Sequence, residues 1–264
     1  MIGTPRDILT RSAPPPDLTI RYGEQPDQLA DVWLPHATPA PLVIFIHGGF
    51  WRAAYDRTHA APLAADLAER GFAVATIEYR RVGQPGGGWL GTFSDVAAAA
   101  AAVPDLLAKE LAHRGLPPVN ADRPILAGHS AGGHLALWYA AVAPDAVGGV
   151  LALAPVADLI AAVRRRLGND AVVALLGGGP DALPDRYASA DPMAHLPLKV
   201  RTIIVHGVED EEVPVELSRD YAESAQRAGD DTALVELAGV EHYAVIDPLS
   251  RAWPAVLEAL RQLT

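Results

Sequence analysis

Short apolar runs alternate with longer helical patterns from residue 41 to the last residue of the sequence. This alternation is typical of a parallel sheet whose crossover helices cover both faces, so it predicts a doubly wound α/β fold. The expected strands are Leu42–Ile46, Ala73–Ile77, Pro124–Ala127, Val150–Leu153, Thr202–Val205 and Ala233–Leu237. The expected helices are Thr58–Arg70, Ser94–Arg114, Ala131–Ala143, Val215–Ala228 and Ala252–Leu263, three of them followed by a glycine that favours a helix end.

Two segments depart from this rhythm. Leu18–Tyr22 and Leu29–Leu34 alternate apolar and polar residues, which predicts an antiparallel hairpin at the sheet edge. Residues 155–199 contain helical pieces broken by three glycines and a proline, and their place after a strand end predicts a small lid. We therefore expect a single domain over residues 1–264, with an N-terminal extension at 1–17 and a lid-like insertion at 155–199.

The composition limits the classes of partner. The 32 acidic and 21 basic residues give a net charge of -11, which repels phosphate backbones and anionic lipids. The sequence has no cysteine, which excludes disulfides, thiolate catalysis and cysteine-bound metal. The N-terminal residues do not read as a secretory leader, and no apolar stretch approaches the roughly 18 residues of a membrane span. We expect a cytoplasmic protein without nucleic-acid or membrane partners; the edge hairpin or the final helix offers a surface for a homodimer.

The motif Gly128-His129-Ser130-Ala131-Gly132 has the pattern G-x-S-x-G. It follows the expected strand at 124–127 and opens the expected helix at 131–143. A serine at such a turn adopts a strained backbone that exposes its hydroxyl at the carboxyl edge of the sheet. The motif therefore predicts that Ser130 is a nucleophile; its alternative reading is an ordinary turn serine.

A nucleophilic serine needs a base, and the base needs an orienting acid. His242 lies just past the last expected strand and is the expected base. Asp210 follows the strand at 202–205 and is the expected acid, whereas its neighbours Glu209, Glu211 and Glu212 are expected to be solvated charges at the start of the next helix. Asp158 is the rival candidate for the acid.

The segment His47-Gly48-Gly49-Phe50-Trp51 follows the first parallel strand. Glycines allow backbone N–H groups to approach a substrate closely. The amides of Gly49 or Phe50, together with that of Ala131, are expected to form an oxyanion hole.

This set of residues resembles the α/β-hydrolase superfamily from about residue 28 onward. Ser130, Asp210 and His242 occur in the chain order of that superfamily, and the segment from His206 to Pro214 is similar to its acid loop. Two segments, HGGFW and GHSAGGHL, are similar to the corresponding segments of the kynurenine formamidases and of their esterase-like relatives with an HGG-x-W signature. The resemblance implies an α/β-hydrolase fold and a serine hydrolase without metal or organic cofactor.

The expected substrate is a small ester or formamide, so the activity is that of a carboxylesterase or an arylformamidase. Trp51 and Trp89 are candidate substrate-binding residues, and packing against the lid is the alternative for them. Two other functions remain open: an exopeptidase or amidase of the prolyl-oligopeptidase type, and a small-molecule-binding module on a hydrolase fold that does no chemistry.

Overall fold

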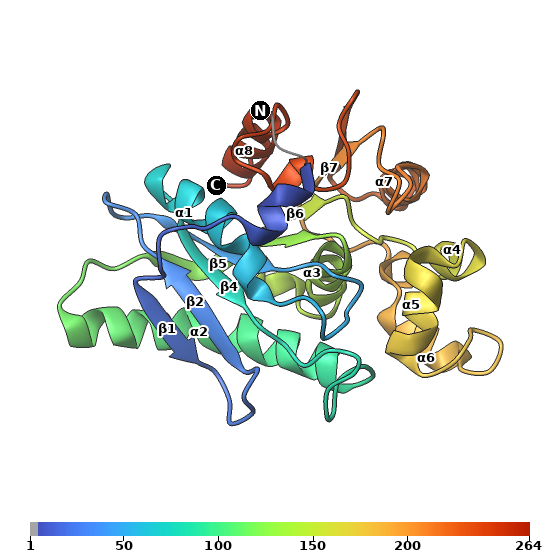
Figure 1. The fold of residues 1–264 in the computed structure, drawn as a ribbon, viewed down its shortest axis with the longest axis horizontal. Helices are drawn as coiled ribbons and strands as arrows, with labels where there is room; N and C mark the ends of the chain where they lie inside the picture. The colour runs from blue at the N-terminus through green and yellow to red at the C-terminus, as the bar shows by residue number, and fades with distance from the viewer. Residues whose placement is uncertain (1–4) are drawn as a thin grey trace.

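The computed structural model describes residues 5–264 and has an eight-stranded sheet at its centre (Figure 1). The order across the sheet is β1-β2-β4-β3-β5-β6-β7-β8. β1 and β2 are antiparallel to their neighbours and the other pairs are parallel. The predicted mostly parallel α/β sheet with an antiparallel edge hairpin is therefore confirmed. The strands are β1 (Leu18–Arg21), β2 (Leu29–Trp33), β3 (Pro41–Ile46), β4 (Ala73–Ile77), β5 (Asn120–His129), β6 (Gly149–Leu153), β7 (Thr202–Gly207) and β8 (Thr232–Leu237).

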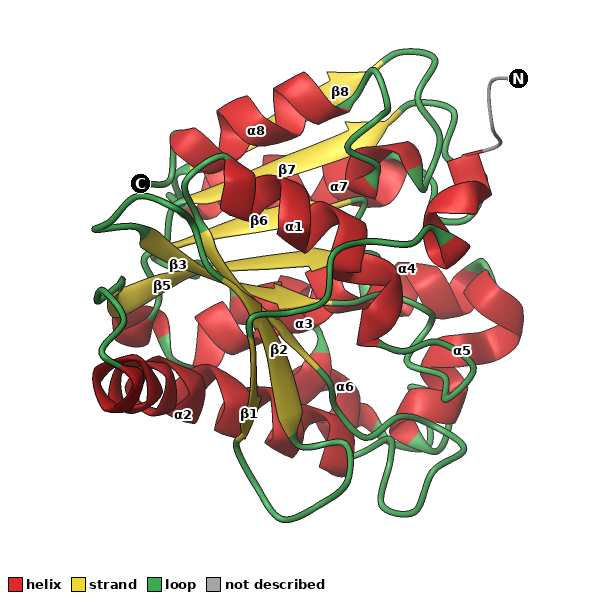
Figure 2. Ribbon diagram, turned by 60° about the vertical axis from the view of Figure 1, so that its left-hand side comes forward, coloured by secondary structure: helices red, strands yellow, loops and turns green. Residues whose placement is uncertain are grey.

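Helices cover both faces of the sheet (Figure 2). One face carries α2 (Gly91–Arg114), α3 (Ala131–Val142) and α7 (Glu216–Ala228), and the other carries α1 (Ala61–Glu69) and α8 (Trp253–Arg261). The glycines after α2 and α7 take left-handed conformations that end these helices, as predicted. Among the described residues, no helix is both long enough and apolar enough to span a bilayer. The cytoplasmic location stays a prediction.

Strand β3 explains why the expected strands are continuous apolar runs. Ile44 and Ile46 belong to the core under α2 and α3, whereas Val43 and Phe45 belong to the core under α1 and α8. Successive side chains of a strand point to opposite faces, so a strand covered on both sides needs apolar residues at every position. Each of these four side chains is at most 1% exposed. Burial of one such side chain contributes about 1.5–3 kcal/mol.

The insertion at 155–199 contains α4 (Leu159–Arg164), α5 (Leu167–Leu176), α6 (Pro184–Ala190) and the 3-10 helix η4 (Pro192–His195). Hydrogen bonds join it to the main body: the Trp89 amide donates to the Leu175 carbonyl at 2.8 Å, and the Trp138 indole donates to the Ser189 carbonyl at 3.0 Å. Residues 168–170 take three consecutive left-handed conformations with φ of 57°, 53° and 59°. The role of the insertion as a lid stays a prediction.

The N-terminal extension contains a 3-10 helix that the sequence did not predict, η1 (Pro5–Thr10). Ile8 is fully buried in the core under α1 and α8, and Arg11 forms a two-pronged ion pair with Asp247. The first four residues of the extension lie outside the described residues. The remaining short helices are η2 (Arg57–Ala60), which precedes α1, η3 (Pro144–Ala146) and η5 (Ala244–Ile246).

Candidate active site

Ser130 sits at the sharp turn between β5 and α3, where the motif predicted it. Its φ of 56° and ψ of -117° are rarely adopted by a residue with a side chain. The backbone holds this strain through hydrogen bonds, because the Ser130 amide donates to the Leu153 carbonyl at 2.8 Å and the Val156 amide donates to the Ser130 carbonyl at 3.2 Å. Strain of this kind is frequent at active sites, so Ser130 stays the candidate nucleophile.

The glycines of the motif are required by close backbone approach. A Cβ on Gly128 would lie 2.2 Å from the Gly132 carbonyl oxygen, and a Cβ on Gly132 would lie 2.0 Å from the Ile46 carbonyl oxygen. Neither contact is sterically possible. The first turn of α3 therefore packs directly against the end of β3, and this brings Ser130 next to the loop that follows β3.

Asp210 and His242 come together from the loops after β7 and β8. His242 Nδ1 lies 2.6 Å from Asp210 Oδ2, and both residues are buried. The other Asp210 oxygen accepts the amides of Glu212 at 2.9 Å and Val213 at 2.8 Å. Burial alone would raise the pKa of Asp210, but hydrogen bonds from His206, His242 and the Val213 amide hold this pKa well below its ordinary value. Asp210 is thus ionised. Because Nδ1 of His242 contacts Asp210, Nε2 is the ring nitrogen of His242 that remains for another partner.

Two further histidines support this pair, and the sequence did not single them out. His206 Nε2 donates to Asp210 Oδ2 at 3.1 Å and to the Val213 carbonyl at 2.9 Å. His129 Nε2 donates to the His242 carbonyl at 3.0 Å, with the two rings 4.5 Å apart. Burial and the neighbouring His242 hold the pKa of His129 well below its usual value, so this ring is neutral. The signal in the sequence was their place, since His129 directly precedes Ser130 and His206 precedes Asp210 by four residues.

The loop after β3 approaches Ser130 from the side. A Cβ on Gly48 would lie 3.2 Å from Ser130 Cβ and 2.9 Å from the His129 carbonyl oxygen. Gly49 and Phe50 have positive φ of 110° and 50°. Within residues 5–264, no acceptor lies within hydrogen-bond distance of the amides of Gly49, Phe50 or Ala131. These three donors, the predicted oxyanion hole, are therefore available to a ligand.

A buried polar network fixes the same loop. The His47 imidazole bridges the Gly48 carbonyl at 2.8 Å and Glu78 Oε1 at 2.9 Å, and it stacks on Tyr79, whose hydroxyl donates to the His47 carbonyl. Burial alone would raise the pKa of Glu78, but His47, Arg81 and the Arg57 amide lower this pKa below its ordinary value. The network orients the glycines that follow His47.

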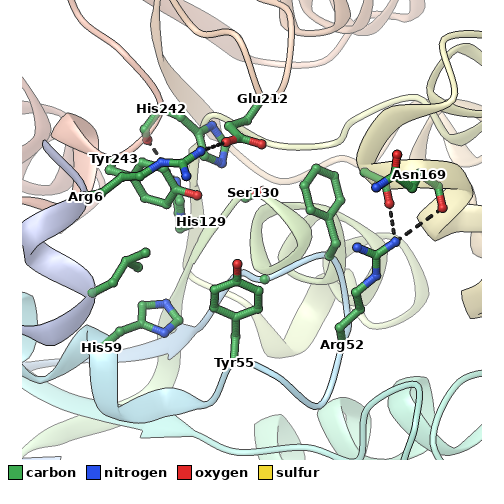
Figure 3. A pocket seen from close by; sticks show the side chains of 14 residues that line it. Arg6, Arg52, Tyr55, His59, His129, Ser130, Asn169, Glu212, His242 and Tyr243 are labelled. Carbon is green, nitrogen blue, oxygen red and sulfur yellow. Dashed lines mark hydrogen bonds and ion pairs between the residues drawn. The ribbon is translucent and has the colours of Figure 1, made fainter.

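A cavity of about 230 Å³ contains Ser130 and His242 on its wall (Figure 3). The wall is formed by the turn after β5, the loops after β3, β7 and β8, the short helices η1 and η2, and the insertion. Arg6 and Leu9 come from η1, which shows that the N-terminal extension is part of the site. The described lining residues are Arg6, Leu9, Gly49, Phe50, Arg52, Tyr55, His59, His129, Ser130, Gly168, Asn169, Glu212, His242 and Tyr243.

Three candidates from the sequence lie elsewhere. Trp51 is fully buried in the core, with its ring edge-on to His134 at 5.2 Å, because its left-handed backbone turns the indole inward. Trp89 packs edge-on against Phe93 at 5.1 Å, and its amide bonds the insertion. Neither tryptophan is among the described residues that line the cavity. The prediction that they contact the substrate is therefore replaced by the alternative, that they pack within the protein. Asp158, the rival candidate for the acid, instead caps α4, because its carboxylate accepts a hydrogen bond from the Ala161 amide at 2.7 Å.

The sheet order, the serine at the turn after β5, the acid after β7 and the histidine after β8 define an α/β-hydrolase fold. Residues 30–224 match the family model described as BD-FAE. The chain belongs to the BD-FAE family.

The chain is also similar to known esterases. A probable isoprenylcysteine alpha-carbonyl methylesterase of Arabidopsis thaliana is 25% identical over 85% of this chain and 50% of its own length. Esterase LipC of Mycobacterium tuberculosis is 27% identical over 84% of this chain and 58% of its own length. The chain thus spans between 50% and 58% of the length of these two curated relatives. Among solved structures, a truncated carbohydrate esterase from gut microbiota has a TM-score of 0.74 and 20% identity, covering 95% of this chain and 99% of that one.

The resemblance to formamidases is local. A kynurenine formamidase of Drosophila melanogaster is 39% identical over 62 residues, which make up 23% of this chain and 20% of the formamidase.

Proposed function

We propose that this protein is a serine hydrolase of esterase type that cleaves a small ester through an acyl-enzyme. The observation that carries the proposal is the 2.6 Å hydrogen bond between Asp210 and His242, with His242 and Ser130 on the wall of one cavity. The esterase names of two curated relatives point to the same reaction type. No other described cluster combines a strained serine, a histidine and an ionised acid.

In the acylation step, His242 Nε2 takes the proton of the Ser130 hydroxyl while the serine oxygen attacks the carbonyl carbon of the ester. Ionised Asp210 stabilises the imidazolium that forms. The amides of Gly49, Phe50 and Ala131 offer hydrogen bonds to the negative oxygen of the tetrahedral intermediate. Loss of one such donor typically costs 10²–10³-fold in kcat. Collapse of the intermediate breaks the carbon–oxygen bond of the ester, and His242 gives its proton to the departing alcohol.

In the deacylation step, His242 removes a proton from water, whose oxygen attacks the acyl carbon. The second intermediate expels the Ser130 oxygen, which regains a proton from His242, and the carboxylic acid leaves. The neighbouring histidine at 129 stays neutral and donates to the His242 carbonyl, so it fixes the loop without competing for the proton.

A formamide is the second candidate substrate. The local match to a kynurenine formamidase and the HGGFW segment favour it. The same residues would cleave the carbon–nitrogen bond, with His242 protonating the departing amine. A direct comparison of kcat/KM for p-nitrophenyl butyrate and N-formylkynurenine distinguishes the two substrates, and we expect the ester to be the better one.

Variants separate an enzyme from a binding module. We expect Ser130→Ala to lower kcat by several orders of magnitude, with Ser94→Ala, an exposed serine on α2, as the matched control. A wild type that hydrolyses neither substrate would favour the non-catalytic alternative, and cleavage of dipeptide amides in preference to both would favour the exopeptidase. Hydrolysis by Ser130→Ala at the wild-type rate would refute the serine mechanism.

A further inference from the structure

Arg52 lines the cavity with a charge that no acidic side chain balances. Its Nη2 donates to the carbonyls of Gly168 and Asn169, the second at 3.3 Å. Within residues 5–264, no carboxylate lies within 4.0 Å of its guanidinium. Arg6, on the wall of the same cavity, is instead paired with Glu212. A guanidinium that lines a small cavity without an acid keeps its charge for a ligand.

We infer that Arg52 binds a carboxylate of the substrate, so that the hydrolysed ester carries an acidic group on its acyl or its alcohol part. This inference rests on the proposed esterase function and narrows its substrate class. A guanidinium is always charged and donates strong, charge-assisted hydrogen bonds to a carboxylate.

The guanidinium is held in place before a substrate arrives. The two carbonyls anchor Nη2, and the Phe50 ring lies 6.0 Å from the guanidinium carbon. The two carbonyls belong to the left-handed turn at residues 168–170, and Figure 3 shows Arg52 extending toward Asn169 of this turn. Nε and Nη1 have no acceptor among the described residues. Nη2 is therefore anchored, and Nε and Nη1, which lie on different edges of the guanidinium, each offer single N–H donors to a carboxylate oxygen.

The rest of the polar wall also favours an anion. Tyr55 and Asn169 line the cavity, and within residues 5–264 neither the Tyr55 hydroxyl nor the Asn169 side-chain amide has a hydrogen-bond partner. Both groups can donate a hydrogen bond to a carboxylate. Glu212, the acid on this wall, already accepts from Arg6. Its charge is therefore locally balanced, whereas that of Arg52 is not.

Two pairs of esters test the inference and locate the carboxylate. In the first pair, p-nitrophenyl hemiglutarate carries the charge on the acyl part, and p-nitrophenyl 5-methylhexanoate is its neutral isostere. In the second pair, 4-acetoxybenzoate carries the charge on the alcohol part, and 4-acetylphenyl acetate is the neutral counterpart. For each pair, the measured quantity is the ratio of kcat/KM for the charged ester to kcat/KM for the neutral one.

We expect Arg52→Gln to lower this ratio by about 10- to 100-fold in one of the two pairs, and Arg52→Lys to lower it less, because lysine keeps the charge. Arg123→Gln is the matched control, since Arg123 also donates to a backbone carbonyl, that of Val147, and does not line the cavity. An unchanged ratio in both pairs for Arg52→Gln, whatever happens to the absolute rates, would overturn the inference and leave Arg52 as a clamp on the insertion.

A binding measurement separates this inference from the proposed reaction. Calorimetry on Ser130→Ala measures the affinity for glutarate and for 4-hydroxybenzoate, with and without Arg52→Gln. Arg52-dependent binding, together with a wild-type protein that hydrolyses none of the esters, would refute the proposed function and retain the carboxylate site. Hydrolysis of neutral esters, with no Arg52-dependent binding of either acid, would retain the function and refute the site.

Discussion

His206 Nε2 lies 3.1 Å from Asp210 Oδ2, the same oxygen that accepts a hydrogen bond from His242 Nδ1 at 2.6 Å. The Ser218 hydroxyl donates to Nδ1 of His206 at 2.7 Å, which fixes the tautomer that donates to Asp210. His206 is fully buried. The acid is therefore held between two imidazoles, of which His242 lines the cavity and His206 does not.

His206 is a positioning residue, and its removal should affect turnover more than binding. We expect His206→Leu to lower kcat by about 10-fold, or about 1.4 kcal/mol, with little change in KM, because Asp210 loses one of its fixed donors. His206→Gln retains an N–H donor and should recover part of the loss. Steady-state kinetics with p-nitrophenyl butyrate checks this, and an unchanged kcat in a folded His206→Leu protein would contradict it.

The two candidate acids should respond differently to substitution. Asp210→Asn should lower kcat by about 10⁴-fold, which is less than the loss on removal of the nucleophile or the base. Asp158→Ala removes the cap of α4 and should lower the free energy of unfolding by about 1 kcal/mol. Rates and urea denaturation of both variants test the assignment. A larger loss of kcat in Asp158→Ala would transfer the role of the acid to Asp158.

His134 should make stability depend on pH. Burial lowers its pKa to about 4, against about 6.5 in an unfolded chain. Between these values the unfolded state binds a proton that the folded state does not bind, so stability falls as the pH falls through this window. The loss attributable to His134 approaches roughly 3 kcal/mol at the lower end of the window.

His134→Gln keeps a donor for the Ala190 carbonyl, which His134 Nε2 contacts at 3.0 Å, and removes the titration. Urea denaturation from pH 7 to pH 4.5 should therefore show a smaller loss of stability in this variant than in the wild type. His59, whose pKa burial and His47 also lower to about 4, is present in both proteins and does not affect the comparison. Equal losses in the two proteins would contradict the prediction.

The close contact between the first turn of α3 and the end of β3 can be tested by adding one methyl group at Gly132. Gly132→Ala places a Cβ 2.0 Å from the Ile46 carbonyl oxygen, so it should lower the free energy of unfolding by about 3 kcal/mol. It should also displace Ser130 and lower kcat. Gly179→Ala is the control, because a Cβ there meets no atom of the described chain within 4 Å. Equal free energies of unfolding for the two variants would contradict the prediction, because the backbone at the turn would then accommodate the extra methyl group without loss of stability.

Much of the fold could be predicted from the sequence because its signals are local. A strand buried on both faces is apolar at every position, as in β3, and a tight strand-to-helix turn requires glycine, as at Gly128 and Gly132. The predicted strands and main helices agree with the structure to within a few residues at most ends. Helix α6 and the 3-10 segment η1 were not predicted, since their short segments lack a clear period.

The parts of the site that the sequence did not predict depend on long-range contacts. Trp51 follows the glycine loop directly, yet its positive φ directs the indole into the core rather than the cavity. Arg6 reaches the cavity wall from the N-terminus and pairs with Glu212 across 206 positions of sequence. His206 shows its role only when β7 and β8 bring its loop beside that of His242. No pattern within one segment carries that information.

Covalent labelling tests the central claim most directly. The protein would be incubated with a fluorophosphonate, which reacts with an activated serine, and the modified residue would be located by peptide mass spectrometry. We predict one label per chain on Ser130, lost in Ser130→Ala and slowed at least 100-fold in His242→Gln. Absence of a label, under conditions in which a control serine hydrolase reacts fully, or a label on another serine, would contradict the account.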